Sequence, residues 1–141
     1  MIDVTWPTPA VIVAAADFLD RRTVRYSTTM YQDTQWTAAH PRVLLRSQWL
    51  PGPGDTLTVE LNPPAALGAV SVVSGLEGTG EGKIQHGVLE VSADGKTFTN
   101  ATDFAPDRAS IELGGKTIAA IRIRLTGAQS ENLVIRDISL K

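Results

Sequence analysis

Hydrophobic residues alternate with polar ones over much of the chain, which is the pattern of half-buried β-strands. The clearest case is 55–61, where Leu57, Val59 and Leu61 are each separated by one polar residue. Because successive side chains of a strand point to opposite faces of a sheet, this alternation predicts one buried and one exposed face. The two prolines after Asn62 predict the end of this strand, since proline cannot donate a hydrogen bond to a neighbouring strand.

The strongest turn signal lies within 87–100, GVLEVSADGKTFTN. Its first half is rich in valine and leucine, Asp94-Gly95 follows, and residues 97–99 lead the chain back. Asp-Gly is typical of short hairpins because glycine accepts the positive φ that such turns require. We therefore expect two antiparallel strands joined by a turn over 93–96.

Further strands are expected at shorter apolar runs, which are 11–13, 43–45, 69–74, 110–113, 118–125 and 133–140. In 118–125 the apolar side chains share one face, and Arg122 and Arg124 share the other. We interpret this arginine pair as a solvated face or one that forms ion pairs across strands. In the last strand, strict alternation places Ile135 and Asp137 on one face and Ile138 on the other.

The segment 21–54 breaks this regularity. It concentrates aromatic and basic residues, shows clean strand character only at 43–45, and ends in the turn sequence Pro-Gly-Pro-Gly. We predict a long irregular segment here, and such segments are usually functional or packed as a lid. Before it, residues 14–20 predict a short helical or irregular turn. The remaining pattern, about seven or eight short strands without long helices, predicts an all-β sandwich or barrel.

Composition narrows the possible functions. The length of 141 residues and the hydrophobic content of 43% predict a single domain, residues 1–141, with one core. The net charge of −2 argues against a nucleic-acid-binding protein. The absence of cysteine excludes disulfides, thiolate nucleophiles and cysteine-based zinc sites. No apolar run reaches the length of a membrane span, and the N-terminus lacks the pattern of a signal peptide.

The order of these elements resembles the discoidin-like, or coagulation factor 5/8 type C, family. The resemblance covers 49–141 and is closest to the version attached to bacterial glycoside hydrolases. It implies a galactose-binding-like β-sandwich jelly roll. The similar segments are Trp49, GDTLTVEL at 54–61, AVSVV at 69–73, LEVSADGKTF at 89–98, IRIRL at 121–125 and LVIRDI at 133–138.

The resemblance also implies a structural calcium ion, with Asp20 and Asp137 as candidate ligands, since calcium prefers carboxylate and carbonyl oxygens. Arg21 stands where the family has glycine in its calcium loop. The alternative interpretation of Asp137 is a polar residue on an edge strand. No other cofactor is expected.

A sugar site requires a flat aromatic surface for the apolar face of the ring and directional polar groups for the hydroxyls. The residues that suit this chemistry lie in segments expected at one end of the sandwich. The alternative is that the two tryptophans close the end of the core and that the polar residues are simply solvated. The candidate ligand-binding residues are Trp36, His40, Arg42, Trp49, Glu77 and His86.

No catalytic motif is present, neither a Gly-x-Ser-x-Gly elbow, nor a His-Glu-x-x-His helix, nor a phosphate loop. Together with the resemblance, which implies carbohydrate binding, this leads us to expect a non-catalytic carbohydrate-binding module that targets a linked enzyme or surface protein to glycans. Its expected partners are a glycan and the rest of a larger polypeptide, in an extracellular, periplasmic or cell-surface location. The alternative is a structural accessory or protein-interaction domain of a larger glycoside hydrolase or glycosyltransferase, with no sugar binding of its own.

Overall fold

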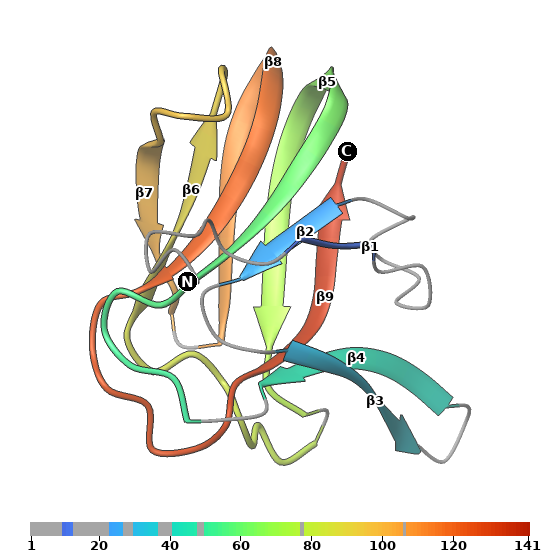
Figure 1. Ribbon diagram of the computed structural model, residues 1–141, viewed down its shortest axis with the longest axis vertical. Helices are drawn as coiled ribbons and strands as arrows, with labels where there is room; N and C mark the ends of the chain where they lie inside the picture. Colours follow the sequence, from blue (N-terminus) through green and yellow to red (C-terminus); the bar gives the residue numbers. More distant parts are fainter. Residues whose placement is uncertain are drawn as a thin grey trace, which may run out of the picture.

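The computed structural model describes residues 10–12, 23–26, 30–36, 41–47, 50–76, 78–105 and 107–141. Within these ranges all regular structure is β-strand (Figure 1), and no helix has the length and apolarity needed to cross a bilayer. The strands are β1 (Ala10–Ile12), β2 (Thr23–Tyr26), β3 (Met30–Trp36), β4 (Pro41–Ser47), β5 (Thr56–Ser74), β6 (Gly87–Ser92), β7 (Thr99–Asp103), β8 (Arg108–Leu125) and β9 (Val134–Leu140).

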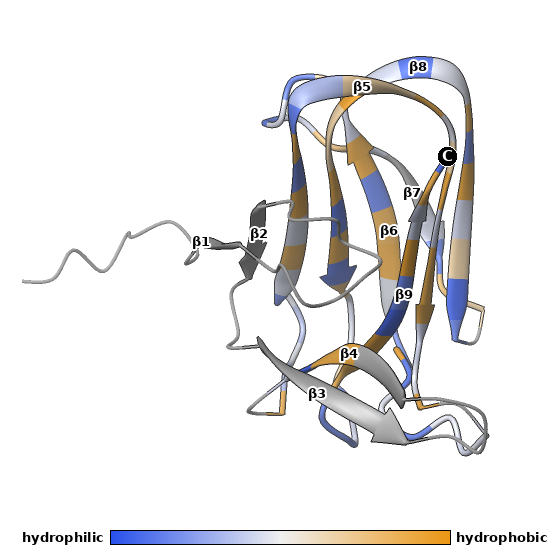
Figure 2. Ribbon diagram, turned by 90° about the vertical axis from the view of Figure 1, so that its right-hand side faces the viewer, coloured by the Kyte–Doolittle hydropathy of each residue, from blue (hydrophilic) through white to orange (hydrophobic). Residues whose placement is uncertain are grey.

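Two long strands, β5 and β8, connect the two layers of the sandwich. They pair antiparallel along most of their length, and the pairing register shifts between Glu60 and Ala65 and again between Leu67 and Ala69. Figure 2 shows the ribbon of β5 and β8 curving over at this point. Because bulges bend a strand pair, one continuous ribbon contributes its first half to one layer and its second half to the other.

The strand order follows from this ribbon. The first half of β5 pairs with β2, and the last part of β8 pairs with β6, which in turn pairs with β7. The second half of β5 pairs with β9, which leads to β4 and β3. One layer is therefore β1-β2-β5-β8-β6-β7, and the other is β8-β5-β9-β4-β3.

The core lies between the two layers and is built mainly from aliphatic side chains of both, with Phe104 among them. Leu57, Val59 and Leu61 are buried from one half of β5, and Val70 and Val72 from the other. Removing this apolar surface from water is the main favourable contribution to folding. The predicted all-β sandwich is therefore confirmed.

The prediction that the prolines after Asn62 end a strand is wrong. β5 continues through Pro63 and Pro64, which lie exposed at the bend where register with β8 is interrupted and fewer backbone donors are needed. Likewise Gly114 and Gly115, with φ of 62° and 89°, sit inside β8 rather than between two separate strands.

The segment 21–54 contains three strands, β2, β3 and β4, in place of the predicted irregular chain. The short strand predicted at 43–45 is confirmed within β4, and that predicted at 11–13 is confirmed for residues 11 and 12 of β1. The turn expected at 14–20 lies outside the described residues. β3 has the polar sequence MYQDTQW, so its strand character comes from pairing with β4 over seven residue pairs.

Strict alternation in the last strand is also wrong. Ile135 and Ile138 are both buried, although they are three residues apart, because the register between β5 and β9 shifts between Val73 and Ser74. The hairpin around Asp94 is confirmed, with a longer turn than expected, since β7 begins at Thr99 and extends to Asp103.

Candidate functional site

One end of the sandwich, here called the loop end, gathers the loops 50–55, 78–86 and 126–133 beside the β3–β4 hairpin (Figure 1). Among the candidate residues that the structure describes, His86 lies in the loop 78–86, and Trp36 and Arg42 lie in the β3–β4 hairpin. The geometry of this end therefore decides which side chains can act together.

The loops 78–86 and 126–133 are joined by two glutamine side chains. The Gln85 backbone N–H donates to Gln129 Oε1 at 2.7 Å, and Gln129 Nε2 donates to the Lys83 carbonyl at 2.9 Å. In return the Ser130 N–H donates to Gln85 Oε1 at 2.6 Å. Gln129 is buried, so its amide replaces water for the backbone groups of the facing loop. This reciprocal bonding holds the two loops in one relative position.

Two buried serine hydroxyls anchor the loop end to the sheets. Ser74 Oγ accepts from the Ile84 N–H at 2.9 Å and donates to the Asp107 carbonyl at 2.8 Å. Ser47 Oγ accepts from the Leu133 N–H at 2.7 Å. Because buried polar groups are costly without partners, these hydroxyls select one path for each loop.

Two glycines allow close approach between the loops. A Cβ on Gly82 would lie 2.5 Å from Val134 Cγ2, and a Cβ on Gly127 would lie 2.8 Å from His86 Cβ. The Thr126 N–H also donates to the His86 carbonyl at 3.0 Å. His86 itself is exposed, so it is presented to solvent from a backbone fixed on both sides.

The β3–β4 hairpin brings two candidate residues to neighbouring register positions. Trp36 pairs with Pro41, and Arg42 pairs with Gln35, next to the chain that links the two strands. His40 is in that link and lies outside the described residues, as do Trp49, Glu77 and Asp20. The sugar-site assignment of all six candidate residues therefore stays a prediction.

Asp137 is half-buried in β9 and pairs with Val73, two residues before the loop that begins at Gly75. Among the residues that the structure describes, no three or more His, Cys, Asp or Glu side chains form a group suited to a metal ion. Asp20, the other predicted calcium ligand, is outside those residues. The calcium site stays a prediction.

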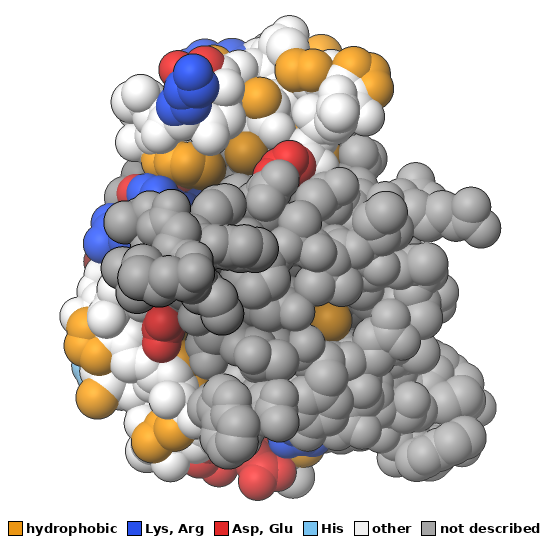
Figure 3. Space-filling view, viewed as in Figure 1, with side chains coloured by type: hydrophobic (Ala, Val, Ile, Leu, Met, Phe, Trp, Pro, Cys, Tyr) orange, Lys and Arg blue, Asp and Glu red, His pale blue; other side chains and the backbone are white. Residues whose placement is uncertain are grey.

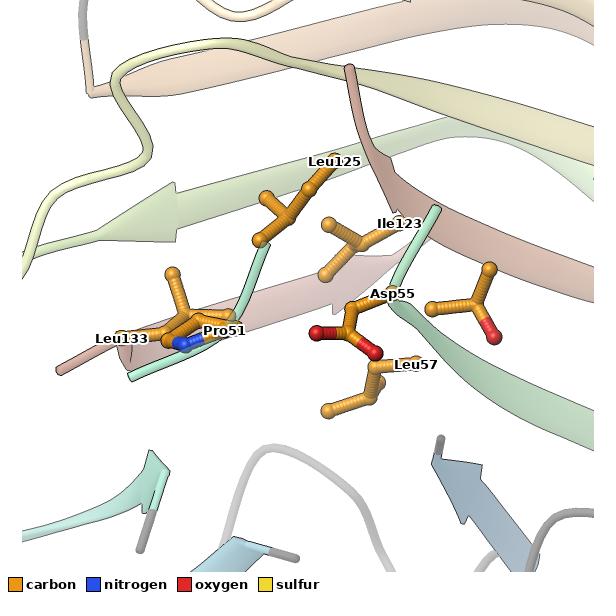
Figure 4. A pocket seen from close by; sticks show the side chains of 7 residues that line it. Pro51, Asp55, Leu57, Ile123, Leu125 and Leu133 are labelled. Atoms are coloured by element: carbon orange, nitrogen blue, oxygen red, sulfur yellow. The ribbon is translucent and has the colours of Figure 1, made fainter. Parts of the chain in front are cut away.

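A small apolar depression lies beneath the loop end (Figure 4). It is lined by Pro51, Leu125 and Leu133 among other apolar side chains, with the carboxylate of Asp55 at its edge. Its volume of ≈10 Å³ matches about one water molecule. The depression is therefore too small for a sugar ring.

The sequence reasoning did not identify the residues that shape the loop end. Gln85, Gln129, Ser47 and Ser74 look like ordinary polar loop and strand residues, and their partners are 10 to 86 positions away. The available signal is that small polar residues flank predicted strands, which is common in any β-protein. Only the pairing of the loops reveals their role.

Comparisons with known proteins define the fold. No protein-family model matches the sequence, and no curated protein sequence matches it. A family 32 carbohydrate-binding module from Clostridium perfringens NanJ, solved with galactose, is 12% identical with a TM-score of 0.56 over 80% of this chain and 92% of that one.

Two further structures agree. The fucose-binding module SpX-3 of Streptococcus pneumoniae is 9% identical with a TM-score of 0.55, over 82% of this chain and 93% of that one. The lectin domain of lectinolysin, solved with Lewis b antigen, is 10% identical with a TM-score of 0.55 over 70% of both chains. Since identities this low establish architecture alone, the described strands form the β-sandwich fold that these carbohydrate-binding modules and lectin domains share.

Proposed function

We propose that this protein is a non-catalytic carbohydrate-binding module whose sugar site is at the loop end. The observation that carries the proposal is the shared fold over about four-fifths of the chain with a module solved with galactose. Fold similarity alone does not determine a ligand, because one sandwich supports many functions. The rigid loop end supplies the second argument, since a preorganised surface loses less entropy when a ligand binds.

In this proposal Trp36 provides the aromatic surface, and Arg42, His40 and His86 provide charged or polar groups for sugar hydroxyls. Trp49 and Glu77 complete the set of candidate residues. Gln85 and Gln129 do not contact the sugar in this proposal. Their hydrogen bonds between the loops position His86.

The module would act by targeting. Binding to a glycan outside the cell, in the periplasm or at the cell surface raises the local concentration of a linked enzyme on its substrate. The proposed partners are therefore a glycan and the remainder of a larger polypeptide. Asp20 and Asp137 are the proposed ligands of a structural calcium ion.

The test is a glycan-array and thermal-shift screen of residues 1–141, with and without calcium. We expect binding to one sugar class, weakened at least about tenfold, or roughly 1.4 kcal/mol, in Trp36→Ala or Arg42→Ala. Lys116→Ala is the matched control, because Lys116 is exposed in β8 outside the loop end. A thermal stabilisation by calcium that Asp137→Asn removes would support the metal site.

A folded protein that binds no glycan would contradict the proposal and favour the accessory-domain alternative. Glycan binding that survives both substitutions, with unchanged unfolding temperature, would reject the loop-end site while keeping the ligand class.

A further inference from the structure

A groove of ≈460 Å³ lies at the end of the sandwich opposite the loop end. It separates the turn between β6 and β7 from the bent part of β5 and β8. Its position follows from the register, in which Gly87 of β6 pairs near the loop end and Ser92 pairs with Ala120 at the groove. In Figure 3 the upper end of the molecule carries basic, acidic and hydrophobic side chains next to one another.

The size and lining of this groove suit a small molecule. Its volume lies in the lower part of the range of roughly 300–1,000 Å³ typical of ligand sites. The lining combines an aromatic residue, Phe98, with polar, charged and small residues. These include Thr58, Asn62, Lys96, Asp94, Glu60 and Ala119. The depression at the loop end, by contrast, is almost entirely apolar and has a volume of ≈10 Å³.

A chain of charged contacts holds Phe98 in place. The guanidinium carbon of Arg122 is 4.0 Å from the centroid of the Phe98 ring. Arg122 Nη2 is in turn 3.0 Å from Oε1 of Glu90, which is buried and also bonded to Arg124. Because Arg122 contacts the ring but does not line the groove, Glu90 and Arg122 are positioning residues for Phe98.

Hydrogen bonds also fix the carboxylate of Asp94, which lines the same groove as Phe98. Asp94 Oδ1 accepts from the backbone N–H groups of Thr97 and Lys96 at 2.9 and 2.8 Å, and from Ser92 Oγ at 2.9 Å. These bonds lower the pKa of Asp94 from 3.8 to about 2, so the carboxylate is ionised at neutral pH. Lys96, an exposed residue of the same turn, adds a cationic donor, so the groove offers a fixed acceptor and a donor beside it.

We propose that this groove is a second carbohydrate-binding site, which takes a neutral monosaccharide or the terminal sugar of a glycan. Phe98 packs against the apolar C–H face of the sugar, and Asp94, Lys96, Asn62 and Thr58 bond to its hydroxyls. A neutral sugar matches the lining because the groove holds both signs of charge beside an aromatic ring. The inference shares its ligand class with the proposed function but does not depend on the loop end.

Two sites at opposite ends would let one module contact two glycan branches, or two chains of a polysaccharide. Simultaneous binding would raise the apparent affinity well above that of either site. Weak binding of monosaccharides at each site is therefore compatible with strong retention on an insoluble glycan.

The test is a titration of the ¹⁵N-labelled full chain with galactose, fucose, N-acetylglucosamine, mannose and glucose, followed residue by residue in NMR spectra. We expect saturable shifts at the amides of Gly95, Lys96, Phe98 and Ala119 with at least one of these sugars. Shifts at His86 and Gly127 report the loop end separately.

Two variants test the groove in different ways. Phe98→Ala removes the ring, and Ala119→Leu adds bulk at a lining residue that takes no part in the Glu90–Arg122 contacts. Both should weaken binding at the groove by roughly tenfold and leave the affinity at the loop end unchanged. Ala105→Leu is the control for added bulk, because Ala105 is exposed between β7 and β8 and does not line the groove.

Shifts confined to the loop end would overturn the inference and support the proposed function. Shifts confined to the groove would support the inference and contradict a sugar site at the loop end. No saturable shift at the groove with any of the five sugars, or groove binding unchanged in folded Ala119→Leu and Phe98→Ala, would also overturn the inference.

Discussion

At the scale of the residue, Asp94 shapes the turn between β6 and β7. Its carboxylate accepts three hydrogen bonds from Thr97, Lys96 and Ser92 although the side chain is exposed. These bonds stabilise the ionised form and lower its pKa from 3.8 to about 2. A carboxyl group whose pKa is lower in the folded state contributes stability at neutral pH, which is lost as the pH falls through that range.

We therefore predict that the folded protein loses stability between about pH 4 and pH 2, because the unfolded chain takes up protons first. Asp94→Asn should show a shallower dependence in this range, since asparagine keeps the acceptor oxygen but cannot titrate. Urea unfolding midpoints measured across this range test the prediction. Identical pH slopes in the two proteins would contradict it.

Glu90 is a second carboxylate with an unusual setting. Burial raises its pKa, but hydrogen bonds and charge from Arg124 and Arg122 outweigh that effect, so the net pKa is lowered. The same contact raises the pKa of Arg124. The alternating arginines of β8 predict a solvated or ion-paired face, and the ion pairs with Glu90 confirm the second of these.

Either arginine alone can still neutralise Glu90. We predict that Arg122→Ala and Arg124→Ala each cost about 1 kcal/mol of unfolding free energy, whereas the double variant costs about 3–5 kcal/mol. The double variant leaves the buried carboxylate with its desolvation cost alone. A double-mutant cycle by chemical denaturation measures the coupling. If the losses of unfolding free energy in the two single variants added up to that of the double variant, Arg122 and Arg124 would not compensate for each other at Glu90.

At the scale of the element, the loop between β5 and β6 depends on glycines for two separate reasons. Gly78 and Gly82 both have positive φ, 88° and 83°, which disfavours any side chain. Only Gly82 also lacks space, because its Cβ would lie 2.5 Å from Val134 Cγ2. The Val134 N–H donates to the Gly82 carbonyl at 2.9 Å, so this contact joins the loop to β9.

The two glycines therefore form a matched pair. We predict that Gly78→Ala costs about 1 kcal/mol, from backbone strain alone. Gly82→Ala should cost about 2–4 kcal/mol, because overpacking against Val134 adds to the strain. Thermal or urea unfolding of both variants measures the difference. Equal losses would mean that the loop moves away from β9 at little cost.

At the scale of the whole molecule, the ribbon of β5 and β8 makes the two layers interdependent. Each layer contains one half of each strand, so neither can lose its packing without affecting the other. The core between them is mainly aliphatic, and β8 contributes Ile121, Ile123 and Leu125 to it among other residues. This arrangement predicts cooperative unfolding of the sandwich.

We predict that Ile121→Ala lowers the unfolding free energy by about 2–5 kcal/mol. The unfolding transition measured by far-UV circular dichroism and the amide-exchange protection of both layers should change together. Leu50→Ala is the control, since Leu50 is 57% exposed and its truncation should change stability by less than about 0.5 kcal/mol. Separate transitions for β6–β7 and β4–β9 would contradict the prediction.

The predictable part of the fold is local in origin. The hairpin at Asp94-Gly95, the alternating run in 55–61 and the apolar face of 118–125 depend on turn chemistry and on a two-residue period, which a sequence displays directly. The candidate loop-end residues were selected by residue type alone. Their neighbours Gln129 and Ser74 were missed, because nothing local marks a side chain whose partners lie in another loop.

The class of fold follows from the sequence alone, since the alternation of apolar residues leaves only packed sheets as a way to bury them. Three other features depend on contacts that form only in the folded protein. β3 is a strand because β4 pairs with it, β5 continues past its prolines because the ribbon bends there, and Ile135 and Ile138 share the core because the register shifts. Each depends on contacts between distant segments, and such contacts produce no repeating pattern of apolar and polar residues in the sequence.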